Sequence, residues 1–134
     1  MQRKFAGFIG IMVVSLMMMS CKSETISAQE ETVLNSLKAI QSSVETKASM
    51  EKYLESVADA KVQIDRLKGS SQANPCFLSA AQKCHASYEI AGKAWQRKMT
   101  EKDLKRKADL DMTMSFSLSF AALEIEKASQ CFHR

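Results

Sequence analysis

No glycine or proline interrupts residues 11–68, and only Gly69, Pro75 and Gly92 follow them. These two residue types mark the turns of a chain, and all-β sandwiches and barrels need many of them. Long segments without either residue are typical of helices. The chain has 134 residues, of which 46% are apolar and 25% are charged, as in one folded domain. The sequence therefore predicts a single all-α domain.

The first twenty residues differ in character from the rest. Arg3 and Lys4 precede an uncharged apolar run over residues 5–19, and this run is shorter than the about 20 residues that a membrane-spanning helix needs. A basic start followed by a short apolar run is typical of a secretory signal peptide. We therefore expect residues 1–20 to be a signal peptide that is removed on export. The remaining 114 residues hold 17 basic and 15 acidic residues, so the exported chain is nearly balanced in charge.

The end of this run reads Met-Met-Met-Ser-Cys and resembles the lipobox of bacterial lipoproteins. In that family the signal peptide is cleaved directly before a cysteine, and this cysteine carries the lipid. The resemblance makes Cys21 the lipidated residue and Ser20 the small residue before it, whereas Met18 stands where the family usually has leucine. It implies a lipid-anchored tether over residues 21–26 and a helical domain over residues 27–134.

The same resemblance implies a location in the bacterial cell envelope. Two or three acyl chains on Cys21 would hold the protein stably on a membrane, since one chain alone binds only marginally. In enterobacterial lipoproteins an aspartate after the lipidated cysteine retains the protein at the inner membrane, and this chain has Lys22 there. The resemblance therefore implies the outer membrane, with the domain facing the periplasm. Secretion after ordinary cleavage behind Ser23 is the alternative.

Residues 27–68 show the periodicity of an amphipathic helix. Ser27 and Glu30 match a capping box, which predicts the helix start. The spacing from Val44 to Met50 is six residues instead of three or four, so the apolar stripe slips to another side of the helix there. This slip fits either one long helix that changes its contact face or a break near residues 46–49. We predict a long first helix, with the break as the alternative. The apolar positions are Val33, Leu37, Ile40, Val44, Met50, Leu54, Val57, Ala60, Ile64 and Leu67.

Residues 69–75 form the clearest loop of the chain. Gly69 predicts the end of the first helical segment, and Asn74 before Pro75 predicts a new helix start. A second apolar stripe then predicts a helix that ends near Thr100, where residues 100–103 cap a last helix. This stripe consists of Phe77, Ala81, Cys84, Tyr88, Ala91, Trp95 and Met99.

Residues 110–120 have two interpretations. Their apolar residues alternate strictly with polar ones, which is the period of a half-buried strand. A lone strand leaves its amide groups without partners, and the rest of the sequence suggests no second strand. We predict a helix with apolar side chains on more than one side, as in the central helix of a bundle or a helix used for self-association. The apolar residues are Leu110, Met112, Met114, Phe116, Leu118 and Phe120.

These elements predict an up-and-down bundle of three or four helices with a C-terminal antiparallel hairpin. The hairpin consists of residues 75–99 and 101–131. A long first helix that lies antiparallel to residues 75–99 and is joined to them by the loop at residues 69–75 places Val44 level with Met99. Residues 27–43 would then extend past the bundle. They form a stalk, fold back as a fourth helix or pair with another protein, and a homodimer through residues 27–43 is one form of such pairing.

An exported chain meets an oxidising compartment, so a disulfide is expected among the three remaining cysteines. In the predicted hairpin Cys76 and Cys131 both lie at the open end, with a mismatch of about 7 Å along the helix axis. Cys84 lies about 20 Å out of level with Cys131, which makes Cys84–Cys131 the weaker alternative. We expect the third cysteine to be a buried core residue. An intermolecular disulfide and a reactive thiol are the functional alternatives.

No catalytic motif is present, so we predict no enzymatic activity. Cys84 and His85 lack a second cysteine three residues earlier, where Ala81 stands, and this excludes covalently attached haem. Haem held without a covalent bond by His85 or His133 is an alternative in a helical bundle. A zinc site from Cys84, His85, Cys131 and His133 has poor spacing, because adjacent residues on a helix face different ways. We predict no metal and no cofactor, with both histidines and the acidic residues in solvent.

Seven basic residues against two acidic ones lie between positions 93 and 107, at the predicted hairpin turn, and give a net charge of +5. Such a cluster fits a solvated turn or a contact with an anionic group, such as lipid headgroups, lipopolysaccharide or an acidic protein surface. Export disfavours nucleic acid as the partner. The basic residues are Lys93, Arg97, Lys98, Lys102, Lys105, Arg106 and Lys107.

Together these features predict an exported, membrane-tethered helical lipoprotein that binds another exported or envelope protein. An immunity, exclusion or inhibitor protein is one concrete form of this prediction. A carrier that holds a small ligand or cofactor in the bundle core is the alternative.

Overall fold

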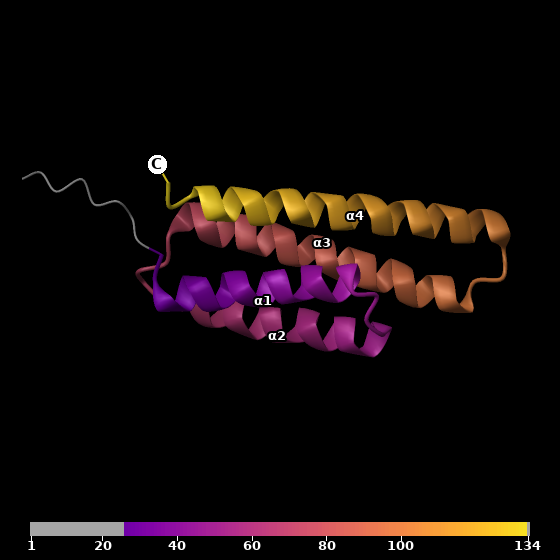
Figure 1. The fold of residues 1–134 in the computed structure, drawn as a ribbon, viewed down its shortest axis with the longest axis horizontal. Coiled ribbons are helices and arrows are strands. Elements are labelled where there is room, and N and C mark those ends of the chain that lie inside the picture. The colour runs from indigo at the N-terminus through magenta and orange to yellow at the C-terminus, as the bar shows by residue number, and fades with distance from the viewer. Residues whose placement is uncertain (1–25, 134) are drawn as a thin grey trace, which may run out of the picture.

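The computed structural model describes residues 26–133, which form four α-helices and no strand (Figure 1). The helices are α1 (Ala28–Glu45), α2 (Met50–Lys68), α3 (Pro75–Thr100) and α4 (Leu104–Gln130). The prediction of an all-α bundle is confirmed, and residues 110–120 lie within α4. The predicted signal peptide, Cys21 and the tether up to residue 25 lie outside the described residues.

The helices begin at residues that cap their free amide groups. The hydroxyl of Ser27 accepts a hydrogen bond of 3.2 Å from the Glu30 amide, and the Glu30 carboxylate accepts one of 3.2 Å from the Ser27 amide. This pair is the predicted capping box. Glu30 is buried, and its second carboxylate oxygen accepts a bond of 3.2 Å from the amide of Asn74, the residue that caps α3. Glu30 therefore ties the start of α1 to the start of α3.

The prediction of a long first helix is wrong, because the chain breaks into α1 and α2 where the apolar stripe slips. Thr46 ends α1, and Lys47 after it has a left-handed backbone with a φ of 53°. The amide of Lys47 donates to the Val44 carbonyl over 3.1 Å, and the amide of Ala48 donates to the Ser43 carbonyl over 2.9 Å. These bonds satisfy the last carbonyl groups of α1 and redirect the chain into α2.

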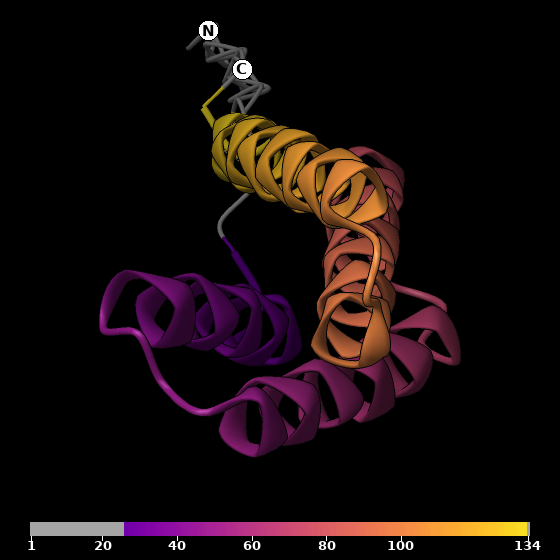
Figure 2. The same cartoon turned by 90° about the vertical axis from the view of Figure 1, so that its right-hand side faces the viewer.

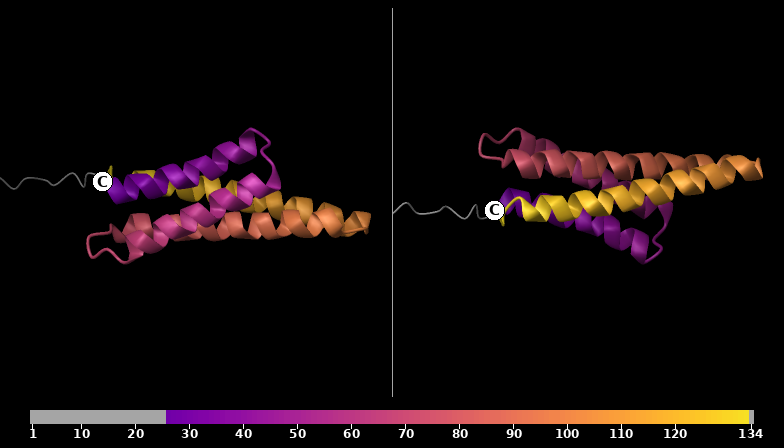
Figure 3. Two further views of the ribbon diagram at one scale, coloured as in Figure 1. Left: turned by 90° about the horizontal axis from the view of Figure 1, so that it is seen from below. Right: turned by 90° about the horizontal axis from the view of Figure 1, so that it is seen from above.

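The helices α1 and α2 lie beside one end of the longer α3–α4 pair (Figures 1 and 3). α3 and α4 run antiparallel, are joined by residues 101–103 and pack against each other along most of their length. Residue 26 and the end of α4 lie at the same end of the molecule. Because α3 and α4 are the longer helices, their connected end projects beyond α1 and α2 (Figure 1).

Residues 27–43 do not extend past the bundle (Figure 1), and the view along the helices shows α1 as one of four helices around the core (Figure 2). These residues belong to α1, which folds back along α2 and supplies a fourth helix. Among the four described helices, no Cα atom of α2 lies within 8 Å of a Cα atom of α4. Val44 and Trp95 line the same cavity. The prediction that Val44 lies level with Met99 is wrong, because the chain reverses between α1 and α2 instead of continuing as one helix.

The core lies where the four helices overlap. Its largest buried side chains include Tyr53, Tyr88, Phe77, Leu37 and Ile40. The Tyr53 hydroxyl donates a hydrogen bond of 2.7 Å to the Tyr88 carbonyl, so this buried polar group has a partner. A Cβ atom at Gly92 would lie 3.2 Å from a ring carbon of Tyr53 and 3.1 Å from a methyl group of Leu54. Glycine at this position therefore allows α2 to approach α3 closely.

A disulfide joins Cys76 at the start of α3 to Cys131 directly after α4. The two Cα atoms are 5.8 Å apart and the cysteines are 55 positions apart in sequence. This is the favoured pairing of the sequence analysis. Phe77 and Phe132 lie next to it with ring centroids 5.3 Å apart. The end of the α3–α4 pair that lies near residue 26 is therefore closed both covalently and by packing.

Candidate functional site

The predicted basic residues lie toward the connected end of the α3–α4 pair, which projects beyond α1 and α2. Lys93 is the exception, because it borders a pocket that Leu54 and Val57 of α2 also line. We call residues 93–107 the hairpin tip. Five of its seven basic side chains are exposed, and Lys98 and Lys107 are half-buried. Since α3 has 26 residues, the tip lies about 39 Å along the helix axis from the disulfide end. The tip is therefore remote from residue 26.

The acidic residues at the hairpin tip are occupied by local contacts. The Glu101 carboxylate accepts hydrogen bonds of 2.9 Å from the amides of Lys102 and Asp103, and Asp103 caps the first amide groups of α4. Lys98 forms an ion pair with Asp111 of α4. Within the part of the chain that the structure describes, the other six cations of the tip form no ion pair. Their charge is available to an anionic surface.

Two large apolar side chains lie among these cations. Leu104 is 82% exposed, and Met99 is exposed as well. The apolar stripe of α3 predicted Met99 to lie in the core, and this is wrong because α1 and α2 end before they reach the tip. Exposed apolar side chains next to arginine are typical of surfaces that bind a partner.

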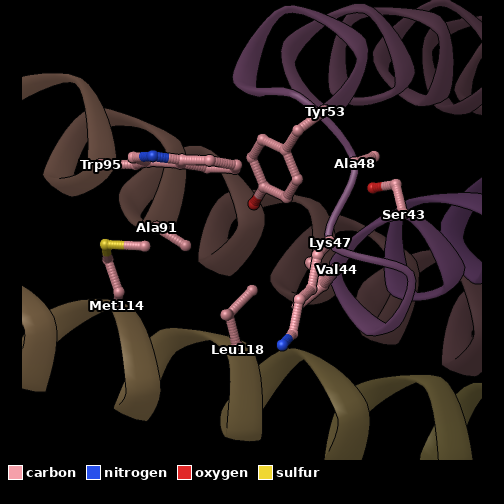
Figure 4. Close-up of a pocket in the computed structure, with 9 residues that line it drawn as sticks. All are labelled: Ser43, Val44, Lys47, Ala48, Tyr53, Ala91, Trp95, Met114 and Leu118. Carbon is pink, nitrogen blue, oxygen red and sulfur yellow. The ribbon is translucent and has the colours of Figure 1, made fainter.

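A cavity of about 250 Å³ lies where the α1–α2 connection meets the middle of α3 and α4 (Figure 4). The rings of Tyr53 and Trp95 form one wall, with centroids 5.7 Å apart, and Met114 and Leu118 of α4 form the opposite wall. Lys47 extends toward α4 at the edge of the cavity (Figure 4). The full lining is Ser43, Val44, Lys47, Ala48, Tyr53, Ala91, Trp95, Met114 and Leu118.

No sequence feature predicted this cavity directly. The one local signal is the slip of the apolar stripe after Val44, because the slip marks the α1–α2 connection that forms the edge of the cavity. The rest of the lining comes from all four helices, and periodicity along one helix does not show where its neighbours diverge.

Two side chains that were expected in solvent are buried. His85 of α3 lies against α2, and its Nε2 donates a hydrogen bond of 3.0 Å to the Val57 carbonyl. Glu124 of α4 is buried, and its carboxylate accepts a bond of 2.7 Å from Lys127. These expectations were wrong because neighbouring helices cover faces that are polar in the sequence. His133 is exposed, as predicted.

Cys84 is the one free cysteine among the described residues, and it is buried in the core. Its thiol donates a hydrogen bond of 3.4 Å to the Ala121 carbonyl. Burial, with the Glu124 carboxylate as a smaller cause, raises the pKa of the Cys84 thiol to about 12. The thiol is therefore protonated at neutral pH. This fits the predicted core residue and leaves little thiolate for a reaction.

The cysteine and histidine residues considered as ligands do not come together. Cys84 lies against α4 and His85 against α2, while Cys131 is bonded to Cys76. Between residues 26 and 133, no group of three or more histidine, cysteine, aspartate or glutamate side chains is placed to hold a metal ion. In the same range, no helix combines the length and the apolar character that crossing a bilayer requires.

Comparisons with known proteins do not place this chain in a family. No protein-family model matches it, and neither a curated protein nor a solved structure does. The proposals below therefore rest on the geometry of the described residues and on the resemblance of residues 17–21 to a lipobox.

Proposed function

We propose that this chain is a lipid-anchored, exported interaction module that binds an anionic partner through its hairpin tip. The observation that carries the proposal is the position of the basic residues at the end of the α3–α4 pair opposite residue 26. Residue 26 follows the proposed lipid site, Cys21, by only five positions. The anchor and the tip then lie at opposite ends of the domain, and both can be engaged at once.

The side chains of the tip support an acidic protein surface as the partner. Arg97 and Arg106 can bind carboxylates through two parallel hydrogen bonds, and Leu104 and Met99 offer apolar contact area. A protein that blocks another exported protein, as in immunity, exclusion or inhibition, needs such a surface and no catalytic group. Exposed charges are screened beyond about 10 Å at 0.1 M salt, so the binding is expected to weaken as salt rises.

Site-specific photo-crosslinking in the producing bacterium tests the proposal. A photoreactive amino acid at Leu104 is expected to capture one partner, and the same group at Val62 of α2, which is 47% exposed, is the matched control. Replacing Lys102, Lys105 and Arg106 by glutamine is expected to abolish the crosslink from position 104, because the charge attraction is lost. Equal capture at positions 104 and 62, or capture that survives the triple substitution, contradicts the proposal.

The cavity supports a second candidate function, a carrier of a small apolar ligand. Its volume of about 250 Å³ is close to the lower end of the range for ligand pockets, about 300–1,000 Å³. Lys47 at its edge suits a ligand with an anionic head group. Trp95 is the single tryptophan of the chain and lines the cavity. The carrier would be favoured if a fatty acid changes Trp95 fluorescence and the photoreactive group at position 104 captures no partner.

A further inference from the structure

The helix α4 has two apolar faces, and only one of them is buried within the chain. With 3.6 residues per turn, each face spans about 80° around the helix axis, and the two faces are about 160° apart. The inner face consists of Leu110, Met114, Leu118, Ala121, Ile125 and Ala128, all half-buried or buried. The outer face, which we call the outer stripe, consists of Met112, Phe116, Phe120 and Leu123, all exposed.

These two faces explain the strict alternation over residues 110–120. Each face repeats every four residues, and the two repeats are offset by two, so apolar and polar residues alternate as they do in a strand. The outer stripe runs for about 17 Å along the helix, and Phe116 near its centre is 70% exposed. A continuous stripe of large apolar side chains, unlike single scattered ones, marks a surface that a partner covers.

Charges of opposite sign lie at the two ends of the outer stripe, on the same side of it. Asp109 precedes Met112 by one helical turn, Lys127 follows Leu123 by one turn, and both are exposed. The Lys127 ammonium group lies 5.8 Å from the centroid of the Phe120 ring, so it borders the stripe directly. Asp109 at one end of the stripe and Lys127 at the other are therefore complementary in charge.

We propose that a second copy of this chain covers the outer stripe, in a two-fold dimer with antiparallel α4 helices. A two-fold axis near residue 118 places Phe116 against the partner's Phe120 and Met112 against the partner's Leu123. The same register brings Asp109 to the partner's Lys127, and symmetry repeats this pair at the other end. One surface thus supplies both members of each apolar and each charged pair.

Charge also decides the relative direction of the two helices. A parallel pair would set Lys105, which lies in line with the stripe, against the partner's Lys105. It would also bring together two hairpin tips that each carry a net charge of +5, and such like charges repel. The antiparallel pair separates the two tips by about the length of α4, roughly 40 Å. Electrostatics therefore favours the antiparallel arrangement.

The charges also favour a second copy over a lipid bilayer. Helices that lie on membranes carry mainly lysine and arginine on their polar side, whereas Asp109 and Glu126 flank this stripe. The dimer goes beyond the proposed function and does not depend on it. In the dimer each hairpin tip lies beside the partner's residue 26, so two lipid anchors would hold the dimer along the membrane surface.

Sedimentation equilibrium of residues 22–134, which include the whole described core and its disulfide, tests the dimer. The wild-type chain is expected to be a dimer at about 100 µM, and Phe116→Ser is expected to weaken the dimer at least about tenfold. The variant should keep its helix content, because Phe116 contributes little to the monomer core. Val62→Ser changes an exposed apolar residue on α2, away from the outer stripe, and should leave the dimer unchanged. A wild-type monomer, or equal weakening by both substitutions, overturns the proposal.

Spin-label distances test the antiparallel register without altering the stripe. A label on Lys105→Cys is expected to lie about 39 Å from the partner's label, since each lies 13 residues from the axis. Buried Cys84 should not take up the label. A distance close to the about 10 Å that separates two packed helix axes would overturn the antiparallel arrangement. A wild-type monomer that binds phosphatidylglycerol vesicles through Phe116 would assign the stripe to a bilayer and also overturn the proposal.

Discussion

At the residue scale, Lys47 has a backbone conformation that is unfavourable for a residue with a side chain. A left-handed backbone costs a residue other than glycine about 1–2 kcal/mol, and Lys47 has this conformation. Glycine adopts it without steric cost. Nothing in the capping bonds of α1 requires a lysine, because Lys47 takes part in them only through its backbone amide. The side chain, which extends along the edge of the cavity (Figure 4), is therefore the part of Lys47 that a function could use.

Lys47→Gly is expected to raise the free energy of unfolding by about 0.5–1 kcal/mol, because it removes the steric cost of the left-handed backbone. Lys47→Ala is the matched control. It removes the same ammonium group but keeps the backbone cost, so it should not stabilise the protein. Guanidinium denaturation of the three proteins measures the difference. A glycine variant no more stable than the alanine variant would contradict this account of Lys47.

The local role of a residue can be predicted from the sequence, whereas its burial by a distant segment cannot. The capping role of Glu30 follows from its spacing to Ser27, because a capping box is local. Its burial and its bond to the Asn74 amide depend on a loop more than forty residues away. His85 and Glu124 are similar cases, since each is buried by a helix that its own sequence neighbourhood does not contain.

At the scale of elements, the helix ends were predictable and one helix break was not. The α3 start at Pro75 and the α2 end at Lys68 follow from local signals. The slip after Val44 fits two helices as well as it fits one helix that changes its contact face. Lysine in a left-handed position is not a sequence signal for a turn, so the alternatives stayed open. The projection of the tip depends on that break, because the break makes α1 and α2 shorter than α3 and α4.

The disulfide at the ends of α3 and α4 carries a prediction at this scale. Replacing Cys76 and Cys131 by serine is expected to lower the free energy of unfolding by about 4 kcal/mol. The physical reason is that a chain segment of 55 positions is no longer closed in the unfolded state. Guanidinium denaturation measures the loss, and the wild-type protein in a reducing agent should show the same loss. If the double variant unfolds at the wild-type midpoint, the disulfide does not stabilise the hairpin.

At the scale of the whole molecule, the proposals involve the two ends of the domain and one side of it. The disulfide end adjoins residue 26 and the proposed anchor, the opposite end carries the basic tip, and the outer stripe runs along α4. The sequence predicted the basic cluster but not its projection, since projection depends on the relative lengths of four helices. It also predicted apolar side chains on more than one side of residues 110–120, but not which side stays exposed, because that depends on the contacts of α4 with α3 and α1.

The lipid anchor on Cys21 is the central claim, because it decides whether the domain is held at a membrane. The most direct test is the intact mass of the protein extracted from the membranes of the producing bacterium. We expect a chain that begins at Cys21 and carries the added mass of a lipid, and we expect Cys21→Ala to abolish both the cleavage and the added mass. A chain that begins at Glu24 and carries no lipid would contradict the account.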